Sequence, residues 1–367
     1  MPASRVSPII VPPPPELCLI RLSALGDTCH TVPVVRAIQR AAPQTRITWV
    51  IGKTEHALLR GLEGVEFAVL DKSKGFAGYF ELRRTLAGRR FPVLLHMHPS
   101  MRGNLASLAV SADIRIGFDR ARAREHQWLF CNRHIAPLER QHVMESFFGF
   151  AAALGVPAGE LEWRIPIPEA DRAFAAAQID TDRPSLVISP CAAPRFRNYR
   201  NWHVRGYAEA AGYAAERYGA QVLVTGGPSE VERSYADGII AQSRAAVRDL
   251  VGKTTLKQLL AVLERASVVL CPDSGPAHMS TAVRTPVVGL YATTNPSRAA
   301  PYLSRHLVVD KYPEAAARML GKRVEELRWG TRVRHPEAMN LITLPDVIEK
   351  LDAAFAERGI GPLRRAM

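Results

Sequence analysis

The first segment whose residues could do chemistry runs from Arg21 to Pro33, RLSALGDTCHTVP, directly after a short apolar run. Asp27 stands close to the start of a predicted helix, and Gly26 before it allows a tight turn. A carboxylate that follows a buried strand lies where open α/β folds bind ligands, and it could remove a proton from a hydroxyl group. The alternative is that Asp27 only caps the helix. The segment contains no GxGxxG pattern, so it does not support a dinucleotide site.

A second candidate segment, CPDSGPAH at residues 271–278, follows another apolar run. Asp273 or Ser274 can cap a helix that begins here, and Pro276 suits its first turn. Gly275 would let a ligand approach the backbone closely. Unpaired N–H groups and the positive end of the helix dipole would then favour a diphosphate. An ordinary capped helix start accounts for the same residues, so both interpretations stay open.

Two further loops could contribute to phosphate or sugar binding. The loop over residues 189–202 carries three arginines, Arg195, Arg197 and Arg200, and an arginine fork pairs well with phosphate oxygens. A solvated basic loop is the plainer alternative. GGPSE at residues 226–230 is another strand-to-helix turn. Its Glu230 could accept hydrogen bonds from ribose hydroxyls, or simply favour the start of a helix.

Short apolar runs alternate along the chain with segments of helical period, which places these loops between strands and helices. We predict strands at residues 17–21, 47–51, 67–70, 93–96, 114–117, 186–189, 221–225, 249–251, 268–271 and 287–291. Helices are predicted at residues 32–40, 54–61, 76–87, 104–111, 256–265 and 344–358. Because the strands are continuously apolar and separated by helices, they should form parallel sheets covered on both faces.

This pattern breaks at residues 165–184, which we interpret as a linker with a short helix. We therefore expect two α/β domains, residues 1–170 and 171–345, followed by a C-terminal helix and basic tail over 346–367. Ligands of such folds bind at the carboxyl ends of the strands, and a cleft between the domains is the natural site. Neither a signal peptide nor a spanning helix is expected, so any membrane contact should be made at the surface.

The charge balance favours an anionic partner. Lys and Arg number 48 against 35 Asp and Glu, a net charge of +13, although a generally basic surface is an equal alternative. Nucleic acid is not expected, because aromatic residues make up only 7% and no RRM, KH or helix-turn-helix pattern is present. The five cysteines form no CxxC pair, and the close pair His96 and His98, which would share one face of a strand, has no third ligand nearby. We predict no metal site.

Taken together, these segments resemble glycosyltransferase family 9, the ADP-heptose lipopolysaccharide heptosyltransferases. The family pattern R-x-S-x-x-G-D-x-x-H-T-x-P is matched between Arg21 and Pro33, and G-x-P-x-E at residues 226–230. The pattern D-[ST]-G-x-x-H is matched by Asp273, Ser274, Gly275 and His278. The similarity spans about residues 17–351, and GFDRARARE at 117–125 and QHV at 141–143 look like the branch that adds the first heptose to Kdo.

The resemblance implies the GT-B fold, two Rossmann-like domains whose parallel sheets face a central cleft, and an inverting transfer without metal or cofactor. Asp27 would be the base that deprotonates the acceptor hydroxyl. The implied donor-binding residues are Arg200, Glu230, Asp273, Ser274, Gly275 and His278, with Arg200 and the helix at Ser274 receiving the diphosphate. Where the family often has Ser or Thr, this chain has Cys191, Ala192 and Ala193, so those hydroxyl contacts are absent.

The implied donor is ADP-L-glycero-D-manno-heptose, and the implied acceptor is the Kdo of Kdo-lipid A. Four arginines could hold its carboxylate and phosphates, although a surface position is the plainer interpretation of each one alone: Arg102, Arg120, Arg122 and Arg124. We expect the enzyme in the cytoplasm, bound peripherally to the anionic surface of the inner membrane. The alternatives are a family 9 transferase that adds the second heptose, and an inactive scaffold, against which the intact Asp27 argues.

Overall fold

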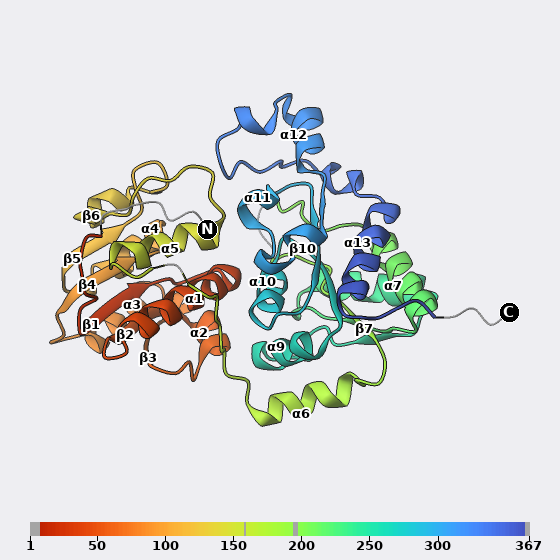
Figure 1. Ribbon diagram of the computed structural model, residues 1–367, viewed down its shortest axis with the longest axis horizontal. Helices are drawn as coiled ribbons and strands as arrows, with labels where there is room; N and C mark the ends of the chain where they lie inside the picture. Colours follow the sequence, from red (N-terminus) through yellow and green to blue (C-terminus); the bar gives the residue numbers. More distant parts are fainter. Residues whose placement is uncertain (1–7, 158, 194–196, 364–367) are drawn as a thin grey trace. The chain divides into compact units, whose positions relative to one another are not determined.

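The computed structural model describes residues 8–157, 159–193 and 197–363. The chain divides into two compact units, residues 1–166 and residues 167–367. Within the described residues, each unit contains one sheet of six strands, and all the strand pairs that form the two sheets are parallel (Figure 1).

In the first unit, the strand order is β3-β2-β1-β4-β5-β6. The strands are β1 Glu16–Ile20, β2 Arg46–Gly52, β3 Val65–Leu70, β4 Phe91–His96, β5 Ala112–Gly117 and β6 Arg133–His134. The helices are α1 Leu25–Ala41, α2 Lys53–Leu59, α3 Phe76–Thr85, α4 Met101–Ser107 and α5 Val143–Ala153, with the short 3-10 helices η1 Lys72–Lys74 and η2 Gln127–Phe130. The order reverses between β1 and β4, so the loops after these two strands frame the place where open α/β sheets bind ligands.

Two layers of helices cover this sheet. Contacts of α3 with α4, and of α4 with η2, place these three elements in a row. Beneath them, Leu82 of α3 and Ala106 of α4 pack in one buried cluster with Ile20 and Leu94 of the central strands. The other layer consists of α1, α2 and α5, because α1 contacts both α2 and α5. Apolar strands between two helical layers explain why both faces of the sheet are buried.

In the second unit, the strand order is β12-β11-β10-β7-β8-β9. The strands are β7 Ser185–Ile188, β8 Gln221–Val224, β9 Val247–Asp249, β10 Val268–Pro272, β11 Val287–Tyr291 and β12 Val308–Asp310. The helices are α6 Glu169–Gln178, α7 Val204–Tyr218, α8 Glu230–Gln242, α9 Leu256–Arg265, α10 Gly275–Ala282, α11 Pro296–Ala299, α12 Tyr312–Leu320 and α13 Leu344–Glu357, with 3-10 helices η3 Tyr302–Leu307, η4 Val324–Glu326 and η5 Ala338–Leu341. Here the order reverses between β7 and β10.

The two terminal helices of this unit are held by specific contacts. Helix α6 packs against α9, and an ion pair joins Arg172 to Glu264. Helix α13 packs against α7, where Tyr218 stacks on Phe355 with ring centroids 4.4 Å apart. The Tyr218 hydroxyl also donates to Asp352 Oδ1 at 2.7 Å. Both helices are therefore parts of the second unit. None of the helices in the described part of the chain is long and apolar enough to cross a bilayer.

Nine of the ten predicted strands coincide with strands of the structure, the one predicted at 249–251 shares only Asp249 with β9, and the structure adds β6 and β12. Strand β6 is only two residues long and both are exposed, so it offers no apolar run to find. Helix α1 begins at Leu25, seven residues before the predicted start, because buried polar residues such as Thr28 and His30 interrupt the apolar pattern. Gly26 therefore lies inside the helix and not in a tight turn, which corrects that expectation.

Candidate active site

The Asp27 segment leaves the sheet at the point where the strand order reverses. Strand β1 ends at Ile20, α1 begins at Leu25, and Asp27 lies in the first helical turn. Ala24 occupies the N-cap position and no side chain caps the helix, so the prediction that Asp27 serves as the N-cap is wrong. The Asp27 carboxylate therefore does not cap the helix and makes other interactions.

Arg21 is the ion-pair partner of Asp27, and it lies almost entirely inside the protein. The Arg21 side chain is 8% exposed and that of Asp27 is 32% exposed. Arg21 also donates through Nη1 to the Met97 carbonyl at 2.6 Å, and its guanidinium lies 5.0 Å from the centre of the Phe147 ring. Burial lowers the pKa of Arg21, and the neighbouring Asp27 offsets part of this shift. The pair therefore presents a carboxylate to solvent on a buried cationic support.

The two histidines considered above as a metal pair have separate roles. His96 ends β4, where its Nε2 lies 3.1 Å from Asn104 Oδ1 and its Nδ1 lies 3.1 Å from Gln127 Nε2. Burial lowers the pKa of His96 to about 4, so the ring is a neutral part of the core. His98 lies beyond the end of the strand, which corrects the expectation that both histidines share one face of it.

His98 lies close enough to Arg21 and Asp27 for their charges to act on it, a neighbourhood that the sequence did not reveal. It is 7% exposed, and its Nδ1 is buried without a hydrogen-bond partner among the described residues. Burial lowers its pKa to about 3, and the charges of Arg21 and Asp27 both act on it. A Cβ atom on Gly103 would collide with the His98 carbonyl, so glycine lets the start of α4 approach it. A neutral imidazole thus stands in the electrostatic field of the Arg21–Asp27 pair.

The two histidines of the motif segments are in contact with each other. His30 of α1 and His142 before α5 form an edge-on ring contact with centroids 5.4 Å apart. His142 is the N-cap of α5, where its Nδ1 accepts a hydrogen bond from Met144 N at 3.1 Å. The fold therefore joins the QHV segment to the Asp27 helix. The ring contact therefore lies between α1 and the start of α5.

The four arginines predicted to bind the acceptor differ in their surroundings. Arg122 is committed to its own loop: it pairs with Asp119, and it donates to Gln141 Oε1 at 2.8 Å and to the Ala136 carbonyl at 2.5 Å. Arg120 lies over the Trp128 ring at 5.0 Å, and Arg124 is exposed. Of these three, Arg120 and Arg124 are better placed than Arg122 to meet a ligand.

Arg102 lines a pocket at the carboxyl edge of the first sheet. The pocket has a volume of about 240 Å³, and its other lining residues include Ser23, Lys53, Glu55 and Lys72. Burial raises the pKa of Glu55, while Lys72 and Arg102 act in the opposite direction. Ser23 belongs to the segment that carries Asp27. The charged side chains that line the pocket are three cations and two carboxylates, Glu55 and Asp71, so a pocket beside that segment suits a hydroxyl-rich ligand.

In the second unit, the start of α10 lies after β10, one of the two strands at which the order reverses. Ser274 occupies the N-cap position, but its hydroxyl makes no capping hydrogen bond. The Ser274 hydroxyl is instead buried without a hydrogen-bond partner among the described residues. The first turn of α10 therefore has no side-chain cap, and its N–H groups and dipole are suited to an anion.

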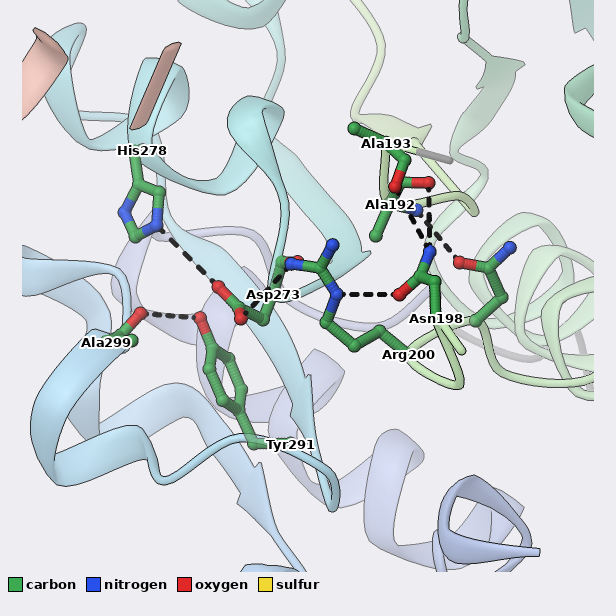
Figure 2. A network of polar contacts seen from close by, with 9 residues as sticks. Ala192, Ala193, Asn198, Arg200, Asp273, His278, Tyr291 and Ala299 are labelled. Atoms are coloured by element: carbon green, nitrogen blue, oxygen red, sulfur yellow. Dashed lines mark hydrogen bonds and ion pairs between the residues drawn. The ribbon is translucent and has the colours of Figure 1, made fainter. Parts of the chain in front are cut away.

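Arg200, Asp273 and His278 meet beside this helix start (Figure 2). Arg200 Nη1 donates to the Asp273 carbonyl at 2.9 Å and lies 3.4 Å from its Oδ2. On the other side of the carboxylate, His278 Nε2 lies 3.9 Å from Asp273 Oδ1. The side chains of Arg200 and Asp273 are each 11% exposed. Three residues predicted to bind the donor thus form one polar network, and Asp273 orients the cation.

The loop after β7 holds Arg200 through amide side chains. Arg200 Nε donates to Asn198 Oδ1 at 2.8 Å, and Asn198 Nδ2 donates to the Ala193 carbonyl at 3.2 Å (Figure 2). Asn201 Oδ1 accepts from Ala192 N at 2.9 Å. The backbone of the residues that replace the family's Ser or Thr therefore fixes the loop. Pro194, Arg195 and Phe196 lie outside the described residues, and Arg197 is exposed.

Glu232, which the motifs do not include, closes the glycine turn before α8 through hydrogen bonds. Ser229 is the N-cap of α8. Glu232 accepts hydrogen bonds from Gly227 N at 2.7 Å and from Ser229 Oγ at 2.6 Å. Glu230 is exposed in the first helical turn. Within the described residues, no three His, Cys, Asp or Glu side chains gather as a group that could hold a metal ion.

Residues 79–327 match glycosyltransferase family 9, the heptosyltransferases. This chain belongs to glycosyltransferase family 9. It is 39% identical over 344 residues to the lipopolysaccharide core heptosyltransferase OpsX of Haemophilus influenzae, an alignment that covers 94% of this chain and 98% of that protein. The resemblance drawn from the motifs is confirmed, and the enzyme is a heptosyltransferase.

Solved structures of the family have the same fold as this heptosyltransferase. A family 9 glycosyltransferase from Veillonella parvula superposes with a TM-score of 0.76 at 20% identity, covering 96% of this chain and all of that one. The Escherichia coli heptosyltransferase WaaC, solved with ADP, gives a TM-score of 0.68 at 20% identity and covers 94% of this chain and 98% of its own. These matches confirm the predicted α/β class and the GT-B fold of two Rossmann-like units.

Proposed function

We propose that this heptosyltransferase transfers heptose from ADP-L-glycero-D-manno-heptose to the Kdo of Kdo-lipid A during synthesis of the lipopolysaccharide core. The observation that carries the proposal is the placement of Asp27 and of the Arg200–Asp273–His278 network, each at the strand reversal of its sheet. The similarity to OpsX along nearly the whole chain supports a core heptosyltransferase rather than another transferase.

The second unit is the proposed site of the donor. The uncapped start of α10 would accept the diphosphate through backbone N–H groups, with Gly275 allowing close approach. Arg200, already oriented by Asp273 and Asn198, would pair with the phosphate oxygens. The proposed roles of His278 and Glu230 are contacts with the donor beside this helix and beside the glycine turn. WaaC, which shares this fold, was solved with ADP, and this supports a nucleoside diphosphate as part of the donor.

The reaction that we propose is a single displacement at the anomeric carbon. The acceptor hydroxyl oxygen forms a bond to this carbon as the bond to the diphosphate oxygen breaks, which inverts the configuration. Asp27 receives the hydroxyl proton, and ADP departs with the electron pair of the broken bond. Negative charge that develops on the leaving oxygen is stabilised by the α10 N-terminus and Arg200. Arg21 holds the Asp27 carboxylate toward solvent and the incoming hydroxyl.

The first unit is the proposed site of the acceptor. Arg120 and Arg124 would contact phosphate or carboxylate groups, while Arg102 contributes from the wall of the 240 Å³ pocket. Arg122 would act by holding the loop that presents its two neighbours, since its guanidinium already has three partners. His98, kept neutral by burial, would act on the Arg21–Asp27 pair and not on the acceptor itself.

A comparison of two acceptors tests the proposal. ADP release should be measured with Kdo-lipid A and with the same lipid already carrying the first heptose. We expect kcat/KM to favour Kdo-lipid A by at least about tenfold, which is about 1.4 kcal/mol of transition-state binding. A preference for the heptosylated lipid would assign the enzyme to the second transfer. If the enzyme releases ADP with neither of the two lipids, the proposed acceptor class is refuted.

A further inference from the structure

Large apolar side chains are exposed together on one part of the first unit. Seven such side chains are exposed in its described part, and all but Val11 lie on α3, on η2, or on α4 and its C-cap Leu108. They are Phe76 and Phe80 at 77% and 71%, Met101 and Leu108 at 42% and 64%, and Trp128 and Leu129 at 38% and 64%. Exposed clusters of this kind mark interaction surfaces, whereas scattered single residues do not.

The three elements adjoin, so these side chains belong to one surface. Helix α3 contacts α4, and α4 contacts η2. Phe76 and Phe80 are four residues apart on α3, and its buried residues Gly78 and Leu82 lie on the other side of the helix. Met101 and Leu108 are seven residues apart and hence nearly aligned along α4 and its end. We call this surface the α3–α4–η2 face.

The same elements, with the segments that lead into α3 and η2, carry a net positive charge. Residues 71–85, 101–108 and 119–130 carry eight Lys and Arg against two Asp and two Glu. Both Glu residues have partners, because Glu81 pairs with Lys74 at 2.8 Å and Glu125 accepts a hydrogen bond from Met101 N. Arg83 and Arg84 are exposed on α3 beside Phe80. Aromatic and aliphatic side chains among cations have the chemistry of a surface that enters the headgroup region of an anionic bilayer.

Trp128 and Arg120 are suited to the boundary between lipid and water. The Arg120 guanidinium lies 5.0 Å from the centre of the Trp128 ring. Tryptophan and arginine both combine an apolar body with a polar end, and tryptophan is enriched at membrane interfaces. The stack holds an amphipathic pair at the edge of the α3–α4–η2 face.

We propose that the α3–α4–η2 face docks on the surface of an anionic phospholipid bilayer. The choice of a bilayer over a protein partner rests on the proposed function, in which the acceptor is itself a membrane lipid. Phe76, Phe80 and Leu129 enter the headgroup layer, and the surrounding cations contact lipid phosphates. Docking of this kind brings the acceptor-binding unit to the bilayer that contains its substrate.

The test is sedimentation of the full chain with vesicles of phosphatidylethanolamine and phosphatidylglycerol that contain no lipid A. Phe76→Ser combined with Phe80→Ser should weaken vesicle binding by about tenfold or more, since two inserted aromatic side chains are lost. The matched control combines Val231→Ser and Ile240→Ser on α8 of the second unit, which are 51% and 38% exposed, and it should bind as the parent does. Binding of the parent should also weaken in high salt and on phosphatidylcholine vesicles.

Activity is measured separately with a water-soluble, deacylated Kdo-lipid A, on which the Phe76 and Phe80 variant should turn over at the parental rate. Equal vesicle binding by this variant, its control and the parent, or no binding by the parent, would overturn the inference. A parent that forms a dimer in sedimentation, which the Phe76 and Phe80 substitutions dissociate without any effect on vesicles, would assign the face to a second copy and also overturn it. Vesicle binding without transfer to any Kdo acceptor would refute the proposed function and leave the docking face standing.

Discussion

Asp27→Asn is the substitution that best separates catalysis from stability in this enzyme. It keeps the size of the side chain and one oxygen that can accept from Arg21, but it removes the negative charge. Arg21 would remain 8% exposed, with the Met97 carbonyl at 2.6 Å and the Phe147 ring at 5.0 Å as its other partners. The substitution therefore leaves a largely buried cation without its counter-charge.

Asp27→Asn is expected to lower both the free energy of unfolding and the rate of transfer, by different amounts. Removing one partner of a fully buried ion pair costs about 3–5 kcal/mol of unfolding free energy. The Asp27 side chain is 32% exposed and solvent screens it, so we expect about 1–3 kcal/mol here. Loss of a general base lowers turnover by about 10²–10⁴-fold, or about 3–5 kcal/mol in the barrier. Since domains have about 5–15 kcal/mol of stability, the variant should remain folded while kcat collapses.

Three measurements on the same sample decide the matter: kcat, ADP affinity by calorimetry, and the urea midpoint. We expect kcat to fall within that range, ADP affinity to stay within about twofold, and the urea midpoint to decrease modestly. Asp113→Asn is the matched control, because Asp113 is 48% exposed and pairs with Arg90 in the same unit. It should leave all three quantities almost unchanged. Normal turnover in Asp27→Asn, or lost ADP affinity with normal turnover, would refute the assignment of the base.

Three other predictions follow from the geometry. Activity should persist in excess chelator, because Arg200 and the start of α10 act on the diphosphate; loss with chelator and recovery with Mg²⁺ would contradict this. Replacing Arg120 and Arg124 by Gln should raise the acceptor KM more than the donor KM, with a smaller defect at high salt; a selective donor defect would reverse the assignment of the two substrates. Burial lowers the pKa of His96 to about 4 and that of His98 to about 3 in the folded protein, whereas an unfolded histidine has a pKa of about 6.5. Below about pH 6.5 the unfolded chain therefore binds more protons than the folded protein does. The stability that these histidines contribute should hence be fully present above about pH 6.5 and fall by about 3 kcal/mol per histidine by about pH 4, as followed by circular dichroism. His98→Asn should reduce this fall, and an unchanged dependence of unfolding free energy on pH would contradict a buried neutral His98.

Most strands of this chain could be predicted because they are largely hydrophobic and bounded by polar loops, whereas β9, Val-Arg-Asp, was misplaced by two residues. Their order could not, since no local pattern states that β4 lies beside β1 or that β10 lies beside β7. That order is what brings the Asp27 and Ser274 segments to the two strand reversals. The motif residues could therefore be found in the sequence, but their placement at the strand reversals could be seen only from the order of the strands.

Partnerships between distant residues were equally hidden. Arg21 appeared only as a motif residue, although it is the cationic support of Asp27. His98 was considered with His96 because two residues separated by one share a face in a strand, but β4 ends at His96 and the chain turns away. Arg122 looked like its neighbours in sequence, and only the folded loop gives it Asp119 and Gln141 as partners.

The central claim of this account is the transfer of one heptose to Kdo, and intact-mass spectrometry of the lipid product tests it most directly. The enzyme is incubated with ADP-L-glycero-D-manno-heptose and Kdo-lipid A, and the reaction is repeated with Asp27→Asn. We expect the parent to add the mass of a single heptose, fragmentation to place it on Kdo, and the variant to yield almost none. A product that carries heptose on any sugar other than Kdo would contradict the account. So would a parent enzyme that forms no product, or a variant that forms as much product as the parent.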